Sequence, residues 1–123
     1  METRVVVCGS RQFKDYDMLE EVLNSILPKY KNIVIVSGHG GGADLAGEEY
    51  AIRHGLFLET FPAEWDKYGR AAGPIRNSKM LEYASRELPV VIAFWDGVSR
   101  GTRYTIEKAK EMGIQTYIYG VER

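Results

Sequence analysis

The chain has 123 residues, which suffices for one ordinary domain and is too short for two. Hydrophobic residues make up 45% and charged residues 27%, values typical of a soluble globular protein. The formal net charge is −1, so the chain lacks the basic excess of proteins that coat nucleic acid. We therefore expect a single domain over residues 1–123, and we consider nucleic acid an unlikely partner.

Cysteine usage and hydropathy bear on the compartment. Cys8 is the single cysteine, so no disulfide can form within the chain, and a reducing compartment fits. It lies in an apolar run, where a small buried side chain is the ordinary interpretation. The sequence starts without a secretory signal pattern, and no apolar run approaches the ~20 residues of a membrane span. We expect a cytoplasmic protein with no membrane partner.

Short apolar runs alternate with longer amphipathic segments along the chain. In chain order, this pattern predicts a strand at Arg4–Cys8, a helix at Asp15–Leu27, a strand at Ile33–Ser37, a helix at Ala43–His54, a strand at Leu56–Phe61, a helix from Pro74 to about Arg86, a strand at Pro89–Trp95, a helix at about Gly101–Met112 and a strand at Gln115–Tyr119. This alternation favours a single Rossmann-like α/β domain, with an about five-stranded parallel sheet and helices on both faces. The long connection Pro62–Gly73 is predicted to be a functional loop.

Two glycine-containing turns follow the first two predicted strands, and such strand ends are where ligands bind in α/β sheets. In Gly9-Ser10-Arg11, glycine lets the backbone approach a ligand, and the arginine fork suits phosphate. The second turn has four glycines between Ser37 and Ala43, and its backbone N–H groups are expected to cradle a phosphate. We assign ligand-binding roles there to Ser37, Gly38, Gly40, Gly41 and Asp44. Asp44 has two interpretations, as a partner of the helix dipole or of a ribose hydroxyl.

Two further clusters precede the last two predicted helices. In the first, Trp65 and Tyr68 offer a stacking face for a base, while arginine and amide side chains reach a phosphate. Its other predicted ligand residues are Arg70, Gly73, Arg76 and Asn77. An aromatic loop packed over the sheet edge is the alternative. The second cluster follows the most hydrophobic strand and consists of Asp96, Gly97, Ser99, Gly101 and Thr102. It is placed to bind an anion at a helix N-terminus, although Ser99 and Thr102 are also ordinary helix caps.

Other chemistries leave no recognisable pattern in the sequence. His39 and His54 are the only histidines, and no spacing of His, Cys, Asp or Glu indicates a metal site. No Ser–His–acid set is recognisable. We expect no metal and no firmly assignable cofactor, with a nucleotide as the expected ligand.

Together, the four clusters resemble the YspA-like branch of the SLOG superfamily, in order across nearly the whole chain. The string Ala72-Gly73-Pro74-Ile75-Arg76-Asn77 is the most specific part of the match. The superfamily groups the DprA/SMF DNA-processing proteins with the Lonely Guy phosphoribohydrolases. The resemblance implies a Rossmann-like fold, a nucleotide or nucleotide derivative at the strand ends, and a homo-oligomer, commonly a dimer.

The resemblance also bears on catalysis. Lonely Guy enzymes carry Pro-Gly-Gly-x-Gly-Thr-x-x-Glu with a catalytic glutamate; here Gly101 and Thr102 match, but Thr105 stands at the glutamate position. The resemblance implies that Arg76 corresponds to the arginine of their other catalytic helix. A carboxylate is needed to stabilise the oxocarbenium-like state of N-glycosidic cleavage. The catalytic candidates are therefore Arg76, Asp44, Glu64, Asp66 and Asp96.

Three functions follow from these features. The first is binding or sensing of a nucleoside phosphate or an ADP-ribose-like molecule. The second is hydrolysis of a nucleotide N-glycosidic bond, which leaves the question of enzyme activity open. The third is DprA-like binding of single-stranded DNA, against which the near-neutral charge argues.

Overall fold

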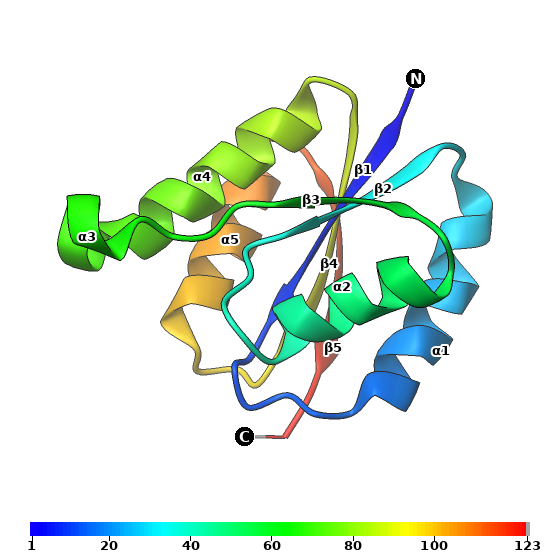
Figure 1. The fold of residues 1–123 in the computed structure, drawn as a ribbon, viewed down its shortest axis with the longest axis horizontal. Helices are drawn as coiled ribbons and strands as arrows, with labels where there is room; N and C mark the ends of the chain where they lie inside the picture. The colour runs from blue at the N-terminus through cyan, green and yellow to red at the C-terminus, as the bar shows by residue number, and fades with distance from the viewer. Residues whose placement is uncertain (123) are drawn as a thin grey trace.

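The computed structural model describes residues 1–122. Its strands are β1 (Thr3–Gly9), β2 (Ile33–Ser37), β3 (Phe57–Thr60), β4 (Leu88–Trp95) and β5 (Gln115–Gly120). Its helices are α1 (Tyr16–Ile26), α2 (Ala43–Arg53), α3 (Trp65–Tyr68), α4 (Ala72–Ser85) and α5 (Arg100–Glu111), with 3-10 turns η1 (Leu27–Lys29) and η2 (Gly69–Ala71). Within the described residues, no helix has the length and apolar character needed to cross a membrane. The predicted single-sheet α/β fold is confirmed (Figure 1).

The five strands form one parallel sheet in the order β3-β2-β1-β4-β5. The chain first builds outward from β1 through β2 to β3, and then returns to the other side of β1 to place β4 and β5. The strand order therefore reverses between β1 and β4. In open α/β sheets, ligands bind beyond the carboxyl ends of the strands at this reversal point.

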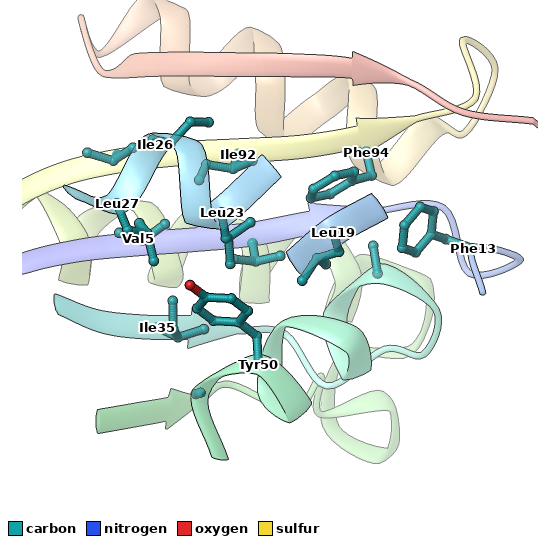
Figure 2. Packing of buried hydrophobic residues seen from close by; sticks show 14 residues of the cluster. Val5, Phe13, Leu19, Leu23, Ile26, Leu27, Ile35, Tyr50, Ile92 and Phe94 are labelled. Atoms are coloured by element: carbon teal, nitrogen blue, oxygen red, sulfur yellow. The ribbon is translucent and has the colours of Figure 1, made fainter. Parts of the chain in front are cut away.

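Helices cover both faces of the sheet: α1 and α2 lie on one face, and α4 and α5 on the other (Figure 1). Because side chains alternate along a strand, Val5 and Val7 of β1 face the first pair of helices, while Val6 and Cys8 face the second. Figure 2 shows the first cluster, where Leu19 and Leu23 of α1 lie against the sheet. β1 is thus held from both sides, which fixes the position of its end.

The segment from Pro62 to Gly73, predicted to be a loop, is instead largely helical. The carbonyl of Glu64 accepts hydrogen bonds from the amides of Lys67 and Tyr68, both at 3.0 Å, and these close the single turn of α3. The η2 turn then leads into α4, which begins at Ala72 rather than at Pro74. Proline is tolerated there because amides in the first helical turn need no intrahelical partner.

Candidate functional site

A cavity of about 400 Å³ opens at the carboxyl ends of β1 and β4, where the strand order reverses. Four loop–helix junctions that are far apart in the sequence contribute to its wall. The lining consists of residues 8–12, Gly40, Asp44, Arg76, Asn77, Met80, Asp96, residues 99–102 and Thr105. Its volume lies in the range of small-molecule sites.

Most of the predicted ligand residues converge on this cavity. Those that line it are Gly9, Ser10, Arg11, Gly40, Asp44, Arg76, Asn77, Asp96, Ser99, Gly101 and Thr102. Ser37, Gly38, Gly41 and Gly97 belong to the same loops without lining it. Tyr68 and Glu64 line a neighbouring cavity, whereas Trp65, Asp66, Arg70 and Gly73 line neither of the two. The binding and catalytic roles of all these residues remain predictions.

The end of β1 is packed too tightly for any residue but glycine at position 9. A Cβ atom there would lie 2.2 Å from the Phe94 carbonyl oxygen and 2.9 Å from the Ala43 Cβ. This close packing aligns Ser10 between two elements: its amide donates to Phe94 O at 3.0 Å, and its carbonyl accepts from Ala43 N at 3.1 Å. The β1 end therefore positions both β4 and the start of α2 around the cavity.

The glycine-rich turn before α2 differs from the open amide cradle predicted from the sequence. The Gly40 amide donates to Asp44 Oδ2 at 2.9 Å, and the His39 amide donates to Ser37 Oγ at 3.1 Å. The first two amides of α2, those of Ala43 and Asp44, also donate to carbonyls within the protein. Four amides are thus already engaged, two of them at the predicted ligand residues Gly40 and Asp44, and these two residues are the part of the turn that lines the cavity.

Arg76 extends from α4 to this turn and lines the cavity. Its Nη1 donates to the Gly38 carbonyl, and its Nε donates to Asn77 Oδ1 at 2.7 Å. A Cβ at Gly38 would lie 2.7 Å from Nη1, so the absence of a side chain there makes room for the guanidinium. Burial lowers the pKa of Arg76, but an arginine side chain stays protonated at neutral pH. The structure thus holds a fixed, partly buried cation in the cavity wall.

Asn77 connects α4 to α5. Its side chain is buried, accepts from Arg76, and donates through Nδ2 to the Gly101 carbonyl at 3.4 Å. The predicted direct ligand contact is thus joined by a second role, in which Asn77 orients Arg76 relative to the N-terminus of α5.

The N-terminus of α5 lies at the cavity, and the side chain of its N-cap residue, Ser99, makes no hydrogen bond to the helix amides. Asp96 Oδ1 accepts from the amides of Val98 at 2.9 Å and Ser99 at 2.8 Å, while Oδ2 accepts from Ser99 Oγ at 2.8 Å. Because its hydroxyl is bound to Asp96, Ser99 makes no side-chain cap to α5. The first helical bond runs from Arg103 N to Ser99 O, so the three preceding amides have no partner within the helix. These amides can donate to an anion in the cavity.

Five cavity residues were not predicted: Cys8, Gln12, Met80, Arg100 and Thr105. Helical spacing offered a signal for two of them, because Met80 and Thr105 lie one turn beyond Asn77 and Thr102. Arg100 opens α5, but its proximity to the cavity depends on the path of the preceding turn. The Cys8 thiol lies in the floor, where burial raises its pKa and keeps it a thiol.

The surroundings of Asp44 raise the pKa of its carboxyl toward neutral pH. Burial raises its pKa from an ordinary 3.8 to about 6, although the Gly40 amide and the Arg76 guanidinium favour the ionised form. At a pH between these two pKa values, the Asp44 carboxyl keeps its proton in the folded state and loses it in the unfolded state. We therefore expect the free energy of unfolding to fall as pH rises from about 4 to about 6, and then to level off.

The Asp44→Asn variant is expected to lose this part of the pH dependence while keeping an oxygen that accepts from Gly40. Urea denaturation of both proteins at pH 4, 5, 6 and 7 measures the difference. If the gap between variant and wild type stays constant over that range, Asp44 does not titrate there.

Two sequence comparisons with known proteins identify the family. The profile of the YspA, cpYpsA-related SLOG family matches residues 3–68, more than half of the chain. The chain is also 32% identical over 123 residues to the Gene 61 protein of Mycobacterium phage D29, with 95% of this chain and 96% of that protein aligned.

Among solved structures, the fold is similar to the X-ray structure of DNA processing protein A (DprA) from Streptococcus pneumoniae. The TM-score is 0.73 at 21% identity, over 96% of this chain and 50% of that one. The chain thus spans about half the length of that protein, and at this identity the likeness shows the fold. The resemblance noted in the sequence is confirmed by the family match, and the chain belongs to the YspA, cpYpsA-related SLOG family.

Proposed function

We propose that this protein binds a phosphate-bearing nucleotide or nucleotide derivative in the cavity between the β1 and β4 ends. Membership of the SLOG family supports a nucleotide-related role. The observation that carries the proposal is the N-terminus of α5, whose first three residues have no helical partner for their amides and line a cavity that Arg76 also lines. Backbone donors and a fixed cation together form an anion site.

The rim of the cavity adds two further cations. Arg11 follows β1 and Arg100 begins α5; both are exposed and line the cavity. A phosphate group at the N-terminus of α5 would gain from the helix dipole as well as from hydrogen bonds. Because three arginines line this cavity while the whole chain carries a net charge of −1, the favourable potential is local. This distribution fits a small anionic ligand better than an extended strand of nucleic acid.

Binding without turnover is favoured over N-glycosidic hydrolysis. Thr105 lines the cavity at the position of the Lonely Guy glutamate, and its hydroxyl donates to the Gly101 carbonyl at 3.2 Å. Two carboxyls line the cavity, those of Asp44 and Asp96. Asp96 accepts hydrogen bonds from its own turn, and the raised pKa of Asp44 weakens it as an anionic stabiliser near pH 6.

The α5 amides are tested by comparing Arg100→Pro with Arg100→Ala. Both variants remove the guanidinium, but only proline also removes the first amide of the helix. Proline is compatible with this position because Ser99 before it is extended, with φ −59° and ψ 119°. We expect Arg100→Pro to bind AMP or ADP about 2- to 10-fold more weakly than Arg100→Ala, by calorimetry. Equal affinities of the two variants would place the phosphate elsewhere.

A further inference from the structure

A second cavity, of about 340 Å³, lies beside the first, and Arg76 lines both. The helical repeat of α4 explains this arrangement. Ala72, Ile75 and Lys79 line the second cavity, while Asn77 and Met80, on the adjacent stripe, line the first. Arg76 falls between the two stripes, so its side chain forms a wall common to both cavities.

The two cavities differ in chemistry. Among the described residues that line the first, none is aromatic, and polar groups and cations predominate. The residues that line the second include the aromatic residues Phe61 and Tyr68 and the apolar residues Pro62 and Ile75. Aromatic faces of this kind stack on nucleic-acid bases, which all present a flat π-surface. The surface suited to a base is therefore in the second cavity, and the surface suited to a phosphate is in the first.

Two charged residues that line the second cavity, Glu64 and Lys79, add hydrogen-bonding capacity. The Lys79 ammonium lies 3.8 Å from Glu64 Oε2 and, like that of Lys67, over the Tyr68 ring, at 5.6 and 5.0 Å from its centre. Glu64 supplies acceptor oxygens for ring or exocyclic N–H groups, and Lys79 supplies donors for ring nitrogens or carbonyls. Trp65, the other aromatic residue of α3, lines neither cavity and is half exposed.

We propose that the ligand spans both cavities, with the base of a nucleoside phosphate in the second and its phosphate in the first. Arg76 lies between the two parts, against the sugar–phosphate. This inference rests on the proposed function and assigns the base and the phosphate of the nucleotide to separate cavities; ribose phosphate alone would occupy only half of the site. Tyr68 rather than Trp65 is then the stacking residue.

Ribose 5-phosphate and AMP test this proposal, because they differ by the base alone; GMP, CMP and UMP extend the panel to the other bases. For wild type, we expect the tightest of the four nucleotides to bind at least about 5-fold more tightly than ribose 5-phosphate. Tyr68→Ala is expected to weaken the binding of that nucleotide about 5- to 100-fold and to leave the affinity for ribose 5-phosphate unchanged. Tyr68→Phe retains the ring and should retain the affinity.

Phe57→Ala is the matched control, since Phe57 is an exposed aromatic residue that lines neither cavity. The inference is overturned if ribose 5-phosphate binds as tightly as every nucleotide. It is also overturned if Tyr68→Ala binds the nucleotide as tightly as wild type does, or if it loses as much affinity for ribose 5-phosphate as for the nucleotide. In these cases the phosphate site, and with it the proposed function, can still stand. If neither ribose 5-phosphate nor any nucleotide binds, the proposed function fails first.

Discussion

Arg76→Ala is expected to weaken the binding of nucleoside phosphates about 10- to 100-fold, the effect of losing a hydrogen bond to a charged group. The guanidinium is positioned before any ligand arrives, because it donates to the Gly38 carbonyl and to Asn77 Oδ1. Little side-chain entropy is then lost on binding. Isothermal calorimetry with AMP and ADP measures the change.

Two variants control for this result. Arg86→Ala removes an exposed arginine from the far end of α4, outside both cavities, and should bind like wild type. Arg76→Lys keeps the charge but loses the planar fork, so its affinity should fall between those of Arg76→Ala and wild type. If a folded Arg76→Ala protein binds nucleoside phosphates with unchanged affinity, the Arg76 guanidinium does not contact the phosphate.

Gly42→Ala is expected to destabilise the fold by about 3 kcal/mol, or roughly 10 °C in Tm. The backbone at Gly42 has φ +49°, and a Cβ there would lie 2.1 Å from the Ser10 carbonyl oxygen. That oxygen accepts hydrogen bonds from Ala43 N at 3.1 Å and Phe13 N at 3.2 Å, so relieving the clash disturbs both. The contact is between backbone segments, which cannot rotate away as a side chain can.

Gly55→Ala is the control for a positive φ without a clash. Gly55 has φ +65°, close to that of Gly42, but no atom lies within 4 Å of a Cβ built there. We expect this control to lose only about 1 kcal/mol. Thermal unfolding of both variants gives the comparison. Equal losses of stability would mean that the close contact of position 42 with the Ser10 carbonyl costs nothing beyond the positive φ.

The sheet and the placement of the site follow from local pattern and general topology. Near-continuous apolar runs such as Val5–Cys8 predict strands that are covered on both faces, and the strand–helix alternation predicts parallel pairing. Because the carboxyl ends of parallel strands share one edge, turns distant in sequence were expected to meet there. The structure brings Ser10, Arg76 and Gly101 to one cavity at that edge.

The detailed chemistry of the turns depends on contacts that no local pattern encodes. The glycine run before α2 has the composition of an anion cradle. However, the Ala43 amide that follows it donates to the Ser10 carbonyl, in a turn more than thirty residues earlier in the chain. Conversely, the Ser99 hydroxyl donates to Asp96 instead of capping α5, so no side chain of the N-cap residue accepts from the first amides of this helix. The α3 turn was missed because four residues give too short a pattern for helical periodicity to register.

Nucleotide binding is tested most directly by thermal unfolding of the wild-type protein with and without nucleoside phosphates, ADP-ribose and the unphosphorylated nucleosides. A ligand at about 100 times its dissociation constant stabilises the folded state by about 2.7 kcal/mol. We expect a saturable rise in Tm with at least one phosphorylated compound, none with its nucleoside, and a smaller rise in Arg76→Ala. No shift with any phosphorylated compound, or equal shifts with and without the phosphate group, would contradict a phosphate-binding nucleotide site.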